Sequence, residues 1–219
     1  MNNTRKIVIF LALFAGFAVC SFAETFYSFS TGLYRLSEQY SEENYGRELD
    51  GINLMIAFNY YPDKFYLGFY VQTFIGAIGK GYELKDDNMD SVNIDSTRDI
   101  RLSIGPSLKL QVGEKIKFPI SIGPIVTFYE EENSNNFSGK SEFFEALNFG
   151  VLGDVSIVVN PSGWFFFKSG ISFSWDLFRM ERGMNTRREL YNVQFKEMKY
   201  GAYSAYTAVI YMGIGVRFE

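Results

Sequence analysis

The chain has 219 residues and a formal net charge of −4, and it contains no histidine and one cysteine, Cys20. Without histidine, a histidine base, a histidine-activated nucleophile and a histidine-ligated metal are all excluded. Apolar residues make up 47% of the chain and aromatic residues 18%, which excludes a disordered protein. Beyond the N-terminus no apolar run is long enough for a membrane helix, so a helical membrane bundle is also excluded.

The first 23 residues have the pattern of a cleaved secretory signal peptide. Arg5 and Lys6 precede a continuous apolar run at 7–19, and the small residues Ser21 and Ala23 precede the expected cleavage point. We therefore predict a signal peptide at 1–23 and one domain at 24–219. An uncleaved anchor and a lipoprotein lipidated at Cys20 are the alternatives, although Val19 stands where a lipoprotein needs a small residue.

From residue 24 onward the sequence alternates with the period of two that is typical of half-buried strands. Ile52, Leu54 and Ile56, for example, alternate with Asn53 and Ala57. Eight strands are predicted at 25–36, 51–61, 65–77, 99–112, 116–129, 143–159, 164–177 and 202–218. Short turns at 62–64, 113–115 and 160–163 alternate with long charged loops at 37–50, 78–98, 130–142 and 178–200. This layout predicts an all-β fold, an eight-stranded antiparallel transmembrane β-barrel with short periplasmic turns and four long extracellular loops.

Side-chain size indicates which face of the strands lies outside. One face carries small residues such as Ser103, Gly105 and Ser107, whereas the other carries bulky apolar residues. An eight-stranded barrel has room inside for little more than side chains, so we expect the bulky face outside. A soluble secreted ligand-binding barrel is the alternative. Two aromatic girdles are expected near the strand ends: Tyr60, Tyr61, Phe65, Tyr66, Trp164, Phe165, Phe166 and Phe218 near the short turns, and Tyr34, Phe128, Tyr129, Phe143, Phe144 and Trp175 near the long loops.

Charged residues on the small-residue face are expected inside the barrel as a polar plug. They are Arg101, Lys109, Lys117, Asp154, Lys168, Asp176 and Arg217. Because a buried charge without a partner is costly, we expect Asp154 to pair with Lys168, Lys117 or Lys109. The alternative is that water wets these residues at the barrel ends. Pro106 and Pro124 each remove a ladder donor, which predicts either a bulge with a side opening or a simple adjustment of twist.

The last long loop is basic, while the other three are acidic. Its six cations are Arg179, Arg182, Arg187, Arg188, Lys196 and Lys199. We expect this loop either to fold over the acidic loops or to bind an anionic lipopolymer or a host or surface glycan; a solvated surface is the alternative. The acidic runs at 86–88 and 130–132 lack the spacing of a calcium loop, so no metal or cofactor is predicted. The acidic chain also gives no sign of nucleic-acid binding.

The layout resembles the small outer-membrane barrels of the OmpX, OmpW and OmpA type, and the Tyr- and Phe-rich acidic composition also resembles small barrels of spirochaetes. The closing stretch, with Tyr211 and Phe218, is similar to the signal that barrel-assembly machinery recognises in this family, except that Glu219 follows the aromatic residue. The resemblance implies a monomer in the outer membrane, with membrane lipids and the assembly machinery as partners. It implies a structural or surface-interaction role, or alternatively a narrow passage for small hydrophobic solutes. Barrel enzymes of this size depend on histidine, so no enzymatic activity is expected.

Overall fold

The computed structural model describes residues 23–40, 45–62, 65–85, 88–92, 96–135, 140–184, 194–197 and 203–218. Residues 1–22 of the predicted signal peptide lie outside the described residues, as do Arg187, Arg188 and Lys199. Within the described part of the chain, no helix is long and apolar enough to span a bilayer.

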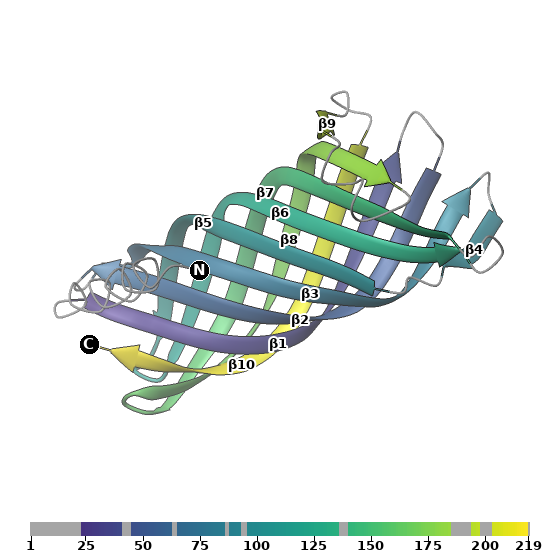
Figure 1. Cartoon of the computed structure of the whole chain (residues 1–219). Helices are drawn as coiled ribbons and strands as arrows, with labels where there is room; N and C mark the ends of the chain where they lie inside the picture. Colours follow the sequence, from purple (N-terminus) through teal and green to yellow (C-terminus); the bar gives the residue numbers. More distant parts are fainter. Residues whose placement is uncertain are drawn as a thin grey trace, which may run out of the picture.

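Eight long antiparallel strands form a closed barrel, as predicted (Figure 1). They are β1 (Ala23–Tyr40), β2 (Tyr45–Pro62), β3 (Leu67–Lys85), β5 (Ser96–Val112), β6 (Ile116–Asn135), β7 (Lys140–Ser162), β8 (Phe165–Met184) and β10 (Tyr203–Phe218). The barrel closes because β10 pairs with both β1 and β8. Two short strands lie beside it: β4 (Asn88–Val92) pairs with β3, and β9 (Lys196–Glu197) pairs with β8. The start of β1 and the end of β10 lie together at the short-turn end, where Thr25 pairs with Phe218.

The strands extend further at the extracellular end than the alternation predicted. β1 continues to Tyr40, β6 to Asn135 and β8 to Met184, so much of each expected loop is paired strand. The apolar pattern stops where the outward face leaves the membrane, but the backbone ladder continues with polar residues on its outer face. On β1 this change falls between Leu33, which is 72% exposed, and the exposed Arg35, which forms an ion pair with Asp50 at 2.7 Å.

A belt of bulky apolar side chains covers the outside of the barrel. Leu33, Ile52 and Ile210 are all more than 60% exposed, and the small polar face lies inside, as expected. Such a surface suits hydrocarbon, so the fold does not fit the alternative of a soluble barrel.

Five aromatic residues assigned to the girdles were placed wrongly. Tyr34, Tyr61, Tyr129 and Phe166 are buried inside the barrel, and Phe144 packs against the interior cluster. They occupy inward-facing positions of their strands, and nearness to a strand end does not change the face on which a side chain lies.

Inward-facing glycines make room for these rings. A Cβ atom on Gly51 would lie 2.6 Å from Cε1 of Tyr34, and one on Gly170 would lie 2.5 Å from the hydroxyl of Tyr211. These rings therefore lie against bare backbone of neighbouring strands. The interior is filled by large residues set on glycines, which explains why a chain rich in both can form so narrow a barrel.

The two Ile-Gly-Pro segments do not open the barrel wall. Ser103 pairs with Ile125 and Ser107 pairs with Ser121, so the register of β5 and β6 is the same on both sides of Pro106 and Pro124, with no inserted residue. The strands are also close there, since a Cβ atom on Gly105 would lie 2.2 Å from the carbonyl oxygen of Ile122. The bulge that the prolines suggested is absent between these described segments.

Candidate functional site

The short-turn end of the interior is organised around the carboxylate of Glu24. Lys109 and Lys117 both donate hydrogen bonds to it, and Nη1 of Arg217 lies 3.5 Å from it. Aromatic rings support the two ammonium groups: Lys109 Nζ is 4.8 Å from the centroid of Tyr61, and Lys117 Nζ is 5.2 Å from that of Phe26. These ion pairs close the periplasmic end with charge that is mutually compensated.

Asp154 has different partners from those that the sequence suggested. Its carboxylate accepts hydrogen bonds from Ser172 and, at 2.8 Å, from the hydroxyl of Tyr211. Lys168 Nζ lies 5.4 Å from the centroid of the Tyr211 ring, while Lys109 and Lys117 form ion pairs with Glu24. Hydroxyl donors therefore replace the expected lysine partner, and Lys168 lies near the ring of the same tyrosine whose hydroxyl donates to Asp154.

The middle of the barrel holds a second buried ion pair. Arg101 donates to Asp99 from Nε at 3.0 Å and to Ser174 from Nη1 at 3.1 Å. Asp176, the neighbouring acid, accepts from Asn148 at 3.1 Å. The cavity beside them, lined by Tyr34, Asn53 and Thr207 among others, has a volume of about 10 Å³. That is about the space of one water molecule, so the side chains beside Arg101 leave little free volume.

The opposite end of the interior is closed by a larger network, which we call the upper ion cluster: Glu38, Arg47, Glu131, Arg179 and Glu181. The Glu38 carboxylate accepts from Arg47 Nε and, at 2.7 Å, from Arg179 Nη1. Arg47 also donates to Glu131 at 2.8 Å, and Arg179 Nε donates to Glu181 at 2.9 Å. The side chains of Glu38 and Arg179 are at most 1% exposed. Four strands, β1, β2, β6 and β8, are thus tied together across the barrel mouth.

Aromatic side chains enclose the upper ion cluster. The guanidinium carbon of Arg179 lies 4.5 Å from the centroid of Tyr203 and 4.9 Å from that of Phe144. The hydroxyl of Tyr203 donates to Glu38 at 2.9 Å. Charges held by this many partners in a buried site are strongly stabilised once formed, and costly to leave unpaired.

Glu38 lies beyond the apolar belt, past Arg35 on β1. Burial alone would raise the pKa of its carboxyl, but the guanidinium groups of Arg47 and Arg179 outweigh burial and lower the pKa to about 2. Glu38 is therefore the anionic centre of the cluster at physiological pH.

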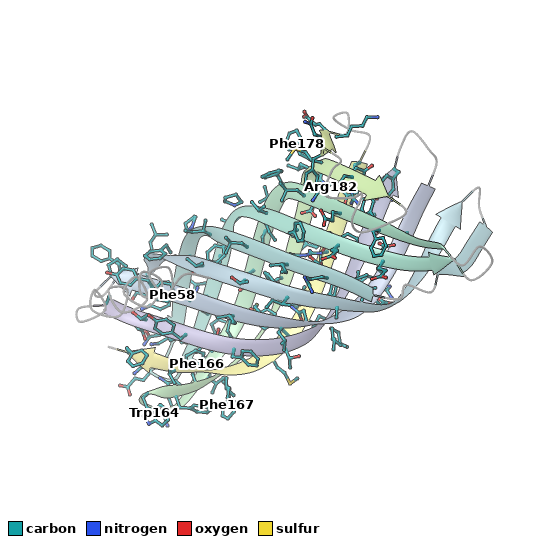
Figure 2. The ribbon with its side chains drawn as sticks, in the orientation of Figure 1. Phe58, Trp164, Phe166, Phe167, Phe178 and Arg182 are labelled. Carbon is teal, nitrogen blue, oxygen red and sulfur yellow. The ribbon has the colours of Figure 1, made fainter. Side chains whose placement is uncertain are left out.

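The predicted basic loop is divided between two places. Arg179 is inside the upper ion cluster, because β8 continues through it to Met184. Arg182 lies on the outer face, at the same end of β8 as Phe178 (Figure 2), where it pairs with Glu145 at 2.5 Å and stacks 4.5 Å from the Phe195 ring. Lys196 is exposed on β9. The prediction of one basic surface loop is therefore wrong for Arg179 and Arg182, which are strand residues with acidic partners.

Six of the seven charges predicted for the interior plug are at most 7% exposed, and Arg217 faces the periplasmic rim. Sequence reasoning missed the acidic residues that pair with buried cations: Glu24 and Asp99 with predicted plug residues, and Glu38 and Glu131 with Arg47 and Arg179. For Glu24 and Glu38 a signal was available, since both share the even-numbered parity of Ser28 and Ser30 on β1. Extending the inward parity beyond the apolar stretch would have found them.

Comparisons with known proteins give the class of the fold. No protein-family model and no curated protein sequence matches the chain. Among solved structures, it is similar to outer membrane protein OprG from Pseudomonas aeruginosa, with 9% identity over 90% of this chain and 96% of that one and a TM-score of 0.59. It is also similar to Neisserial surface protein A, with 11% identity, coverage of 88% and 97%, and a TM-score of 0.52. A major outer membrane protein from Thermus thermophilus has 10% identity, coverage of 88% and 99%, and a TM-score of 0.50. The fold is that of the small eight-stranded outer-membrane β-barrels.

Proposed function

We propose that this chain is an outer-membrane protein whose barrel anchors a surface-exposed end for interaction, and that it neither conducts solutes nor catalyses a reaction. The single observation that carries the proposal is the closed interior. Ion pairs at Glu24 and Glu38 close its two ends, and the cavity between Tyr34, Asn53 and Thr207 has the volume of one water molecule.

The extracellular end supplies the interacting surface in this proposal. The paired strands continue beyond the belt and present exposed charged residues such as Arg35, Asp50 and Arg98, as well as the exposed rings of Phe178 and Phe195. Because the strands are paired there, the surface is held in place before a partner arrives, which lowers the entropic cost of binding. A host or surface glycan is the partner class that we propose.

A passage for small hydrophobic solutes finds less support. It would need a side opening, but the register is the same on both sides of Pro106 and Pro124, and Gly105 lies against the carbonyl oxygen of Ile122, at the place where the sequence suggested one. Export by cleavage of residues 1–23, and assembly through a C-terminal signal that includes Tyr211 and Phe218, complete the proposal.

Cysteine labelling tests the orientation. In a Cys20→Ser background the chain has no other cysteine, so Gln39→Cys and Glu114→Cys each give one thiol, at exposed sites on opposite ends. A membrane-impermeant maleimide should label Gln39→Cys on intact cells and Glu114→Cys only after lysis. Equal labelling of the two on intact cells contradicts the proposal.

Planar-bilayer recording tests the closed interior. Purified protein should give no stepwise current where a general porin gives open channels, and liposomes that contain it should not swell in small sugars. Reproducible conductance steps would overturn the proposal.

A further inference from the structure

A groove crosses the lipid-facing side of the barrel where β7, β8 and β10 meet. It has a volume of about 450 Å³ and is lined by outward-facing side chains of Ile157, Val159, Phe167, Ser169, Met212 and Ile214. Lys168 and Gly213, which are paired and belong to the interior face, also line it. Their main chain therefore forms the floor of the groove.

The pairing of the strands explains why the groove is there. Ser169 is opposite Ile157 on one side and Met212 on the other, while Phe167 is opposite Val159 and Ile214. Along β8, Ser169 stands between the outward-facing Phe167 and Ile171, which are 52% and 57% exposed. One small side chain surrounded by large ones leaves a depression in an otherwise even belt.

The groove is apolar although a serine lies in it. The hydroxyl of Ser169 donates to the carbonyl oxygen of Tyr211 at 3.1 Å, so its polar group is satisfied by the backbone. The side chain of Lys168 is 4% exposed and lies inside the barrel. A ligand in the groove therefore meets hydrocarbon side chains. The volume of the groove is within the range of small-molecule sites.

We propose that this groove holds one acyl chain of a phospholipid from the periplasmic leaflet. The groove lies within the belt and towards the short-turn end, where Trp164 is 67% exposed and points away from the barrel, as Phe167 does (Figure 2). Tryptophan at this height is typical of the membrane interface. An acyl chain in the groove makes van der Waals contacts with both sides and with the floor. It therefore makes more contacts than an acyl chain on an even surface. The inference rests on the outer-membrane location and orientation proposed above, and it is independent of the proposed surface role.

Native mass spectrometry of mildly solubilised protein tests the proposal. Wild type should retain one phospholipid more than Ser169→Phe, whose ring fills the depression. Ser169→Ala removes the hydrogen bond without filling the groove, and Ala77→Phe adds the same bulk at an exposed position on β3; both should retain as many lipids as wild type. Heat-modifiable gel migration establishes that each variant is folded, and Ser169→Leu provides a smaller filling residue.

A second measurement uses the wild-type chain alone. In vesicles that contain phosphatidylethanolamine with a photoactivatable group on its acyl chain, crosslinks should concentrate at Phe167 and Met212 relative to the outward-facing Ile75 and Leu102. Equal lipid retention by wild type and Ser169→Phe overturns the proposal, as does even crosslinking around the belt. A dimer that Ser169→Phe dissociates would instead assign the groove to a second copy of the chain, and retention of a small apolar compound in place of lipid would assign it to that solute.

Discussion

The carboxylate of Glu38 on β1 accepts a 2.7 Å hydrogen bond from Nη1 of Arg179 on β8, although 141 residues separate the two in sequence. Both side chains are almost fully buried. Glu38 also accepts hydrogen bonds from Arg47 and Tyr203. It is therefore the shared acceptor that links the two arginines of the upper ion cluster. Loss of its charge would leave two guanidinium groups without their common partner.

Glu38→Gln should therefore destabilise the barrel by about 3–5 kcal/mol, the cost of breaking a buried ion pair from one side. Unfolding in urea, followed by gel migration and tryptophan fluorescence in lipid vesicles, measures the change. The control is Asp50→Asn, which removes the exposed partner of Arg35 and should cost at most about 1 kcal/mol. Equal effects of the two substitutions would show that the cluster does not stabilise the fold.

The stability that Glu38 contributes should depend on pH in a defined window. Its pKa is lowered to about 2 in the folded protein from an ordinary value of 4.5, so the folded state binds this proton less readily than the unfolded state. The contribution is fully present above the ordinary pKa and is lost as pH falls through the folded value. The difference in unfolding free energy between wild type and Glu38→Gln should be constant from pH 7 to 5 and should shrink towards pH 2. A difference that is unchanged in acid would contradict the assigned ionisation.

Two glycines provide a matched pair for the packing of the interior. Gly170→Ala would place a Cβ atom 2.5 Å from the Tyr211 hydroxyl and 2.6 Å from the Val155 carbonyl oxygen, and should destabilise the barrel by about 1–3 kcal/mol through overpacking. Gly153→Ala meets nothing within 4 Å and should be neutral or stabilise by up to about 1 kcal/mol, because alanine restricts the unfolded chain. Urea midpoints of the two variants measure the contrast, and a similar loss in both would argue against ring-on-glycine packing.

The apolar belt predicts a dependence on depth. Ile56 is 56% exposed in the belt, at the centre of the outward-facing positions 52–60 of β2, and Ile56→Arg should cost about 2–4 kcal/mol in lipid vesicles, as expected for arginine near the bilayer midplane. Gln39→Arg, beyond the belt at an exposed position, should leave stability unchanged. If arginine were equally tolerated at both positions, the outer face would not be in contact with hydrocarbon.

Phe218 tests the proposed assembly signal. Its ring is 42% exposed and packs edge-on against Tyr27 at 5.8 Å, so its packing contribution is modest. Phe218→Ala should slow the appearance of folded protein in cells while refolding into detergent remains close to the wild-type rate. Pulse-chase labelling with heat-modifiable migration measures the rate of folding in cells. Rapid dilution from urea into detergent measures the rate of refolding. A matching defect in detergent would assign Phe218 a structural role instead.

The sequence was sufficient for the barrel, because one-face burial specifies register and strand number through a period of two. The strand ends could not be predicted in the same way, since pairing beyond the belt no longer needs an apolar face. The interior was predicted in composition but not in pairing. Asp154 bonds to Ser172 and Tyr211 rather than to a lysine, and such partners depend on the shear that brings distant strands to one level. Arg179 was predicted in a loop because the strand end could not be predicted. Its acidic partners were missed because pairing across the barrel could not be predicted.

The continuation of the strands above the membrane has an immunological consequence. Residues 129–132 on β6 and 143–146 on β7 are directly paired, so neighbouring positions at this end of the barrel, which we propose is exposed on the cell, come from separate parts of the chain. An antibody raised against the folded barrel would recognise a discontinuous epitope there, and linear peptides copied from any one strand would not reproduce it.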